Sequence, residues 1–597
     1  RSTNAANEVG RPTLFSMLII IAAHIPIFAL QRHEGRIFQP MALSVTTALV
    51  GSLIFSLTLV PLLAYWMLRK GIPHGDNGLV SWAKRVYEPV LLWALDRPRK
   101  VVTIALSGFA LSMVAAAHLG SEFLPELNEG TFWVNWDMPA SVSQEEAGKV
   151  LRKARMQLLT IPEVRTVVSK AGQPEDGTDP KTLSMAEVFV DVKPAEEWRK
   201  GMTRDMLIEE MDQKLAVIPG VDPAFSMPIR DNVLESISQI KGQIVVKVSG
   251  DDLSELRRMT ESMQREFKQV QGVQRAEIDR LGEVPQLIID IDRDRAARLG
   301  LNVGDIQDVI ESALAGRATT EIWEGERKFS VVLRLAGDRR SVINLPATPI
   351  ALPGGGYATL ENVATIRQGS GAMNIAREAG RRTMAIGIFI KDRDMGSVVA
   401  DMKTRVEKNI KVPNEYNITW SGEFENQERA MKRLSVVVPI SLLLIFVLLF
   451  DAFGSFKTAS LILINVPLAL IGGFVALWIF SIPLSVSAAI GFIALSGQAV
   501  LNGVVMLTVF QQLQASGMTV VDAVLEGSMQ RLRTVLMTAM LAALGLLPMA
   551  LSHDIGSETQ RPLAIVVIGG LFTATLLTLI ALPALYVAWF DRKPKSA

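Results

Sequence analysis

Eight long apolar stretches that lack Asp and Glu run through this chain of 597 residues. Most of them approach the roughly 20 residues that a helix needs to cross a bilayer. An apolar content of 49% and a positive mean hydropathy are also high for a soluble protein. The sequence therefore predicts a polytopic α-helical membrane protein. The stretches cover residues 12–30, 40–68, 101–120, 434–450, 458–480, 484–511, 532–552 and 562–590.

Basic residues between these stretches orient the chain in the membrane. Lys and Arg gather at 69–100 and in the tail at 591–597, and the positive-inside rule makes that side cytoplasmic. Residues 121–431 then form a large domain on the opposite side, together with short loops at 31–39 and 553–561. A formal net charge of +1 gives no basic footprint for nucleic acid.

The loop at 69–100 has an amphipathic pattern of its own. Five apolar residues recur there at helical spacing, with basic residues between them. This pattern is typical of a helix lying on a membrane surface. A helix packed on the cytoplasmic ends of its neighbours fits equally well, and the sequence leaves both open. The five residues are Leu79, Trp82, Val86, Val90 and Trp93.

The domain at 121–431 holds most of the charge and alternates short strands with helices. Its first part, 121–239, has a βαββαβ order, that of a ferredoxin-like lobe with helices on one face of a sheet. A second lobe of the same kind comprises 240–292 and 371–431. Residues 293–370 interrupt it as a hairpin-rich insertion. We therefore expect a large α+β domain outside the membrane.

Two distant segments repeat nearly the same phrase. IPIFALQRHEGRIFQPMA at 25–42 and LPMALSHDIGSETQRPLA at 547–564 share prolines at one offset of 522 residues. Repeats that run in the same direction, related by an axis along the membrane normal, are a transporter architecture. If the second copy begins near residue 101, the offset implies about 420 further residues upstream (101 − 522 = −421). We expect this chain to be the second half of a duplicated twelve-span transporter with the tail of the first half.

Essentially the whole chain resembles the heavy-metal efflux branch of the resistance-nodulation-division permeases. The motifs are the phrase at 25–42, GSEFLPELNEG at 120–130, IDRDRAARLGLNVGDIQDVI at 291–310 and GFIALSGQAVLNGVVML at 491–507, the last closest to the cobalt-zinc-cadmium type. The resemblance implies a homotrimeric, proton-driven permease of the bacterial inner membrane, joined to a periplasmic adaptor protein and an outer-membrane channel. It implies a secondary transporter, with a metal cation as substrate and no cofactor, and not an enzyme.

The resemblance also names the parts of the chain. The two outer lobes become periplasmic porter lobes, and the insertion becomes a docking subdomain. The rest comprises 1–68 with the last two spans of the first repeat, 69–100 as a cytoplasmic loop, 101–120 as one span, 432–590 as five spans and 591–597 as a cytoplasmic tail.

Metal ligands are expected in the outer domain. In copper and silver members of the branch, three methionines form a cleft site, and the matching positions here are Asn135, Met185 and Glu235. The chain has no Cys, and its five His all lie outside 121–431. A divalent ion bound there must use oxygen donors, which favours zinc, cobalt, cadmium or nickel over copper(I) and silver(I). Further candidate ligands, or solvated loop acids, are Asp179, Glu187 and Asp231.

Proton coupling requires a titratable group in the membrane, and the eight apolar stretches contain no acid. In the family the relay acids occupy the fourth span, which we expect to lie upstream of this chain. His24 and His118 remain as either relay or packing residues. Gln498 and Asn502 lie one helical turn apart, so their amides either partner an acidic span or join helices.

Three alternative functions stay open from the sequence. Copper or silver efflux would need methionines such as Met138 and Met227 to assemble a soft site. Multidrug efflux would need an aromatic pocket, although aromatic residues make up only 6% of the chain. A membrane sensor that transports nothing is the third. A hydrolytic enzyme is disfavoured because the outer domain has neither Cys nor His and shows no nucleophile motif.

Overall fold

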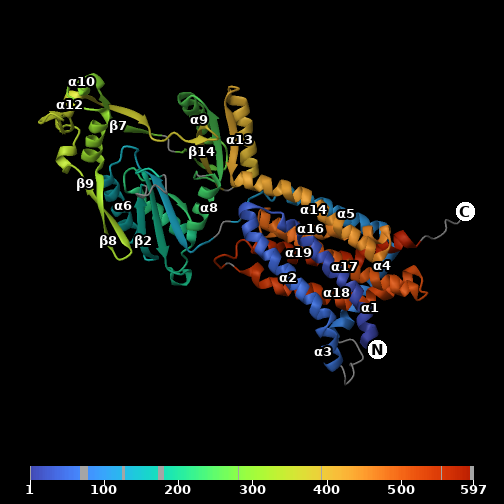
Figure 1. Ribbon diagram of the computed structural model, residues 1–597. Helices are drawn as coiled ribbons and strands as arrows, with labels where there is room; N and C mark the ends of the chain where they lie inside the picture. Colours follow the sequence, from blue (N-terminus) through green and yellow to red (C-terminus); the bar gives the residue numbers. More distant parts are fainter. Residues whose placement is uncertain are drawn as a thin grey trace.

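The computed structural model shows a bundle of long helices joined to a separate α+β domain (Figure 1). It describes residues 2–67, 78–123, 125, 128–172, 181–238, 240–279, 282–391, 393–552 and 554–591. Within these residues, seven helices are long and apolar enough to cross a membrane, and a shorter apolar helix spans Thr13–Phe28. The eight predicted spans are therefore all found as apolar helices.

The helices of the bundle match the apolar stretches closely. The span predicted at 458–480 consists of two helices, α15 and α16, that follow each other directly. Helices α3 and α4 lie at the end of the bundle away from the outer domain (Figure 1). The bounds are α1 Ser2–Phe28, α2 Arg32–Leu57, α3 Leu59–Met67, α4 Gly78–Asp96, α5 Pro98–Ala117, α14 Glu423–Phe453, α15 Phe456–Leu463, α16 Asn465–Ile479, α17 Val486–Ala515, α18 Val520–Leu551 and α19 Arg561–Phe590.

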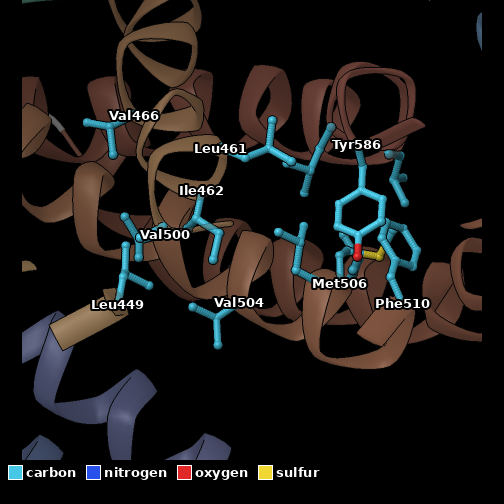
Figure 2. Packing of buried hydrophobic residues seen from close by; sticks show 14 of the residues in the cluster. Leu449, Leu461, Ile462, Val466, Val500, Val504, Met506, Phe510 and Tyr586 are labelled. Carbon is cyan, nitrogen blue, oxygen red and sulfur yellow. The ribbon is translucent and has the colours of Figure 1, made fainter. Parts of the chain in front are cut away.

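The bundle is built around α16, α17 and α19, whose side chains are the most buried of the spanning helices. Small residues let two of them touch: a Cβ on Gly472 of α16 would lie 2.0 Å from the carbonyl oxygen of Gly569 in α19. Such close backbone approach is the usual device for joining helices in lipid. Figure 2 shows the apolar cluster between α15, α17 and α19, where the rings of Phe510 and Tyr586 meet edge to face at 5.3 Å.

The amphipathic segment at 69–100 contains helix α4, which packs on its neighbours through one face. One face, with Tyr87, Leu91 and Ala94, is buried, and the Tyr87 hydroxyl donates to the carbonyl oxygen of Leu579 in α19 at 2.6 Å. The predicted apolar face, which includes Trp82 and Trp93, is exposed. The helix thus packs on its neighbours through one face and leaves the other available to a membrane surface.

One predicted loop is wrong. The segment 31–39 is helical, because α2 begins at Arg32, whereas the loop predicted at 553–561 does lie between α18 and α19. Helix α2 therefore carries Glu34, which is fully buried and lies 3.5 Å from the Arg429 guanidinium of α14. The prediction that the spans lack acids holds for the apolar stretches but not for the helices that contain them.

In the first outer unit, four strands and the helices α6 and α7 follow the expected βαββαβ order, and a third helix, α8, comes after them. Its antiparallel sheet has the order β2-β3-β1-β4, and one face is covered by α6 and α7 around a core of Val, Leu and Met side chains. Both helices begin at a hydroxyl cap, Ser143 for α6 and Thr203 for α7. The bounds are β1 Thr131–Asp137, α6 Gln144–Leu158, β2 Val164–Ala171, β3 Met185–Val192, α7 Arg204–Ala216, β4 Ala224–Ser226 and α8 Pro228–Ser238.

The second outer unit repeats this arrangement. Its strands lie in the order β6-β14-β5-β15, with β13 paired to β14, and α9 and α13 cover one face. The order matches that of the first sheet, strand for strand. The bounds are β5 Ile244–Gly250, α9 Leu253–Phe267, β6 Val273–Ile278, β13 Arg377–Glu378, β14 Arg381–Ile390, α13 Met395–Asn409 and β15 Asn417–Gly422.

The insertion is larger than the predicted 293–370. Among the described residues, strands β7 and β12 pair with each other and with no other strand, so this two-stranded ribbon belongs to the insertion and not to the second sheet. The part of the second lobe placed at 283–292 therefore moves to the insertion. The bounds are β7 Glu283–Ile291, α10 Arg293–Arg298, α11 Val303–Ile310, β8 Arg317–Glu324, β9 Arg327–Leu333, β10 Pro349–Ala351, β11 Tyr357–Thr359, α12 Leu360–Val363 and β12 Ala364–Ala372.

Candidate metal centre

Two central strands of the first sheet place polar side chains on the face opposite α6 and α7. Strand β1 sends Phe132, Val134 and Trp136 into the core, so Asn135 points to the other face. In the antiparallel register with β3, Asn135 lies directly opposite Glu187. Both side chains are buried. Two residues that are 52 positions apart in the chain thus become cross-strand neighbours (187 − 135 = 52).

Helix α8 covers this polar face. It starts with Pro228, and its first backbone N–H groups, on Ile229 and Arg230, donate to the Glu129 carboxylate at 2.7 and 3.0 Å. A carboxylate at the helix N-terminus favours a start at this point. The helix contacts β1 of the first sheet and β15 of the second. The polar face is therefore enclosed where the two outer units meet.

The predicted acids on α8 reach this site. Asp231 is buried and accepts a hydrogen bond from the Asn135 Nδ2 at 2.9 Å. Glu235, one turn further along α8, approaches the Lys181 ammonium at 3.4 Å, and the same ammonium pairs with Glu187. Strand β1, strand β3 and helix α8 together bring Asn135, Glu187, Asp231 and Glu235 to one cluster, which we call the oxygen cluster.

The sequence interpretation missed the cations of the oxygen cluster. Lys181 is buried against Glu187, and Lys170 of β2 lies 2.8 Å from the second oxygen of Glu187. Burial raises the pKa of the Glu187 carboxyl, but hydrogen bonds from Lys170 and Lys181 outweigh burial and leave the pKa below its usual range. Glu187 is therefore a charged carboxylate at neutral pH. Lys181 is only six residues before Glu187 in the chain, and a basic residue so near a candidate ligand was the one sequence signal for this ion pair.

Asp231 has the opposite behaviour. Burial raises its pKa to about 6, the positive charge of Lys241 opposes this rise, and the negative charges of Glu187 and Glu235 add to it. Asn135 donates to Asp231 through its amide nitrogen, while its amide oxygen is buried and has no hydrogen-bond partner among the described residues. An oxygen of this kind is an available ligand for a hard or borderline cation.

The methionines do not form a thioether site in the described part of the chain. Met185 shares the face of Glu187 on β3, as expected. Met138 is part of the apolar core below the sheet, and Met227 is buried, with its sulfur accepting from the Glu129 N–H at 3.4 Å. Asp179 lies outside the described residues. The described residues contain no group of three or more His, Asp and Glu arranged to hold a metal ion.

The polar residues predicted in the membrane lie in different helices: His24 is in α1, and Gln498 and Asn502 are in α17. His24 is buried, with its Nδ1 2.8 Å from the carbonyl oxygen of Ile20 in its own helix. Asn502 is buried in α17, and Gln498, one turn earlier, is half-buried. Gly497 and Gly503 bring α17 close to Ile20 of α1 and Ile462 of α15. The acid missed by the sequence interpretation is Glu34, whose only signal was its place in the repeated phrase.

Comparisons with known proteins agree with this architecture. Residues 1–589 match the AcrB/AcrD/AcrF family. The chain is 38% identical to the cation efflux system protein CzcA of Alcaligenes sp. strain CT14 over 595 residues, 98% of this chain and 56% of that protein. It is 35% identical to the cation efflux system protein CusA of Escherichia coli K12, over 99% of this chain and 58% of that protein.

A crystal structure of a heavy metal efflux pump shares 38% identity with this chain at a TM-score of 0.85, over 98% of this chain and 58% of that one. The chain thus spans somewhat more than half the length of these relatives. The relatives are cation efflux proteins and a heavy metal efflux pump, and the chain itself belongs to the AcrB/AcrD/AcrF family.

Proposed function

We propose that this chain is part of the inner-membrane permease of a proton-driven tripartite pump that exports divalent cations such as zinc, cobalt, cadmium or nickel. The observation that carries the proposal is the buried oxygen cluster, where amide and carboxylate groups from three elements meet. Relatives named for cobalt, zinc, cadmium and nickel resistance support this cargo. Oxygen donors suit an ion that must be released after it is bound.

The wider architecture is part of the same proposal. The two outer units are ferredoxin-like porter lobes in the periplasm, the insertion is a docking subdomain, and the helices are the second half of a duplicated twelve-span bundle. Two sheets with the same strand order support the lobes, and helices α2 and α19 of the repeated phrase support the duplication. A homotrimer, a periplasmic adaptor and an outer-membrane channel complete the pump.

Copper(I) and silver(I) export is the second candidate, because copper and silver members belong to the branch that the sequence resembles. The oxygen cluster favours the divalent ions, since Asn135 and Glu235 stand where the copper branch carries methionine. The cargo is decided by expressing the full-length permease in a host without its own pumps and measuring growth with each metal. We expect resistance to a divalent ion to fall with Glu187→Ala, Asp231→Ala or Glu235→Ala, and to fall less with Met185→Ala.

A matched control is Asp205→Asn, which removes an exposed acid of α7 in the same outer unit. It should leave resistance unchanged at equal expression. Export of silver or copper(I) that depends on Met185 and not on the three acids would overturn the cargo assignment.

A further inference from the structure

Lys181 holds the position that a cargo cation needs. Its ammonium pairs with Glu187 of β3 and lies 3.4 Å from Glu235 of α8, so one positive charge bridges two carboxylates from two different elements. The lysine side chain is 8% exposed and Glu187 is 1% exposed. A divalent ion that bridged the same carboxylates would replace this contact, because both cannot occupy the space between them.

One atom of the oxygen cluster is left without a partner. The amide oxygen of Asn135 is buried and unpartnered among the described residues, although the side chain donates to Asp231 from its other atom. A buried polar atom without a partner is costly, so its retention points to a group that is absent when the site is unloaded.

We propose that Lys181 is an internal competitor for the cargo ion: it pairs with Glu187 and Glu235 in the unloaded site and must be displaced before a divalent cation binds. This inference rests on the metal site proposed above. Without Lys181, Glu187 would be buried with two opposing charges, that of Lys170, whose side chain is 53% exposed, and that of Lys241. The lysine therefore keeps the empty site charge-balanced.

Displacement is physically accessible. A lysine ammonium is strongly hydrated and sits on a flexible stem, so it can move into water when a divalent ion takes its place. Ligand oxygens lie at about 2.0–2.2 Å from zinc, so Glu235, with a side chain that is 37% exposed, must move closer than it lies to the ammonium now. The consequence is a weakened affinity, because the ion must compete with the ammonium for the two carboxylates.

Zinc binding to the purified full-length permease tests the proposal. The affinity for Zn²⁺ alone is measured by competition with a chromophoric chelator. Lys181→Gln should bind Zn²⁺ about tenfold to hundredfold more tightly than the wild type, the contribution of one charge-assisted hydrogen bond. Lys181→Arg, which keeps the charge, should bind no more tightly than the wild type.

Two controls separate competition from other effects. Lys170→Gln also removes a partner of Glu187, but from a half-exposed position, and should change the affinity less than threefold. The double variant Lys181→Gln/Glu187→Gln should lose the gain, because the gain acts through Glu187. An unchanged or weaker affinity in Lys181→Gln, or an equal gain in the double variant, overturns the proposal.

A second measurement uses the protein with its wild-type sequence, in case Lys181→Gln folds poorly. Acetylation of lysines by an amine-reactive ester is followed by mass spectrometry as Zn²⁺ is added. Lys181 should become more reactive, while the exposed Lys200 should not change. If zinc binding depends on Glu187 but leaves Lys181 protected from acetylation, displacement of Lys181 is ruled out and the metal site itself is not. Binding that does not depend on Glu187 rules out the proposed metal site itself.

Discussion

The buried pair of Glu34 and Arg429 gives the sharpest stability prediction. Glu34 of α2 is fully buried, and its Oε1 lies 3.5 Å from the Arg429 Nη2 on α14. Removing one partner of a buried pair costs about 3–5 kcal/mol, because the other charge stays buried without compensation. Arg429 is itself 22% exposed. We therefore expect Arg429→Met to lower the free energy of unfolding by about 3 kcal/mol, the lower end of that range.

The double variant Glu34→Gln/Arg429→Met isolates the cause. It removes both charges, so most of the lost stability should return. Lys432→Met is the matched control, since Lys432 is nearly one turn further along α14 with a side chain that is 75% exposed. It should change the stability by less than about 0.5 kcal/mol.

Thermal unfolding of the detergent-purified permease, followed by tryptophan fluorescence, gives the comparison. The midpoint of Arg429→Met should fall by at least about 3 °C, and that of the double variant by less than half as much. If the double variant unfolds as early as Arg429→Met, the loss comes from packing of the arginine stem, and the argument from a buried uncompensated charge is refuted.

Four further predictions concern other parts of the chain. Gly472→Leu places a side chain against the backbone of α19, where even a Cβ would lie 2.0 Å from a carbonyl oxygen. We expect the detergent-purified variant to give no peak of folded protein in size-exclusion chromatography. The Glu163 carboxylate accepts from Arg199 at 2.6 and 2.8 Å, and these bonds hold its pKa below its usual range. Its stabilisation is therefore complete above the unfolded pKa near 4.3 and disappears as the pH falls through the folded value. Glu163→Gln should destabilise the outer domain by about 1.5–3 kcal/mol at pH 7, and by less in acid, as measured by urea unfolding. Asn502→Leu should lower metal resistance more than it lowers surface expression, because the bundle loses a buried amide; unaltered resistance would leave only a packing role. Residues 121–431 expressed alone should unfold cooperatively, since their cores are internal to the outer units, and a persistently aggregated product would count against this boundary.

The local patterns predicted the elements well and their partners less well. Apolar length was enough for the spans, and alternating strands with amphipathic helices were enough for the βαββαβ order. The same alternation could not say that β7 pairs with β12 instead of the second sheet, because a strand pattern does not specify its neighbour. Glu34 was placed in a loop because its polar neighbours outweighed the helix that tertiary burial imposes.

For the candidate site too, the sequence predicted the residue types but not which residues meet. The expectation of oxygen donors followed from the absence of Cys and of His in the outer domain, a matter of composition. The meeting of Asn135 with Asp231 depends on the placement of α8 over β1, which involves contacts 96 residues apart. Lys181 was overlooked because a charged loop residue is usually solvated, and only the fold shows that it is buried.

Helix α14 continues directly from strand β15 of the second outer unit into the bundle (Figure 1). At the junction, Gly422 has φ 84°, and a Cβ there would lie 2.7 Å from the carbonyl oxygen of Gln243, so only glycine fits. The 31 residues of α14 make a rod of about 46 Å with one internal proline, Pro439. A rod clamped to a sheet at one end acts as a lever: a tilt of the outer unit by a few degrees displaces the far end by several ångströms. Any tilt of the outer unit would therefore reach the spans as a sideways displacement of α14 itself.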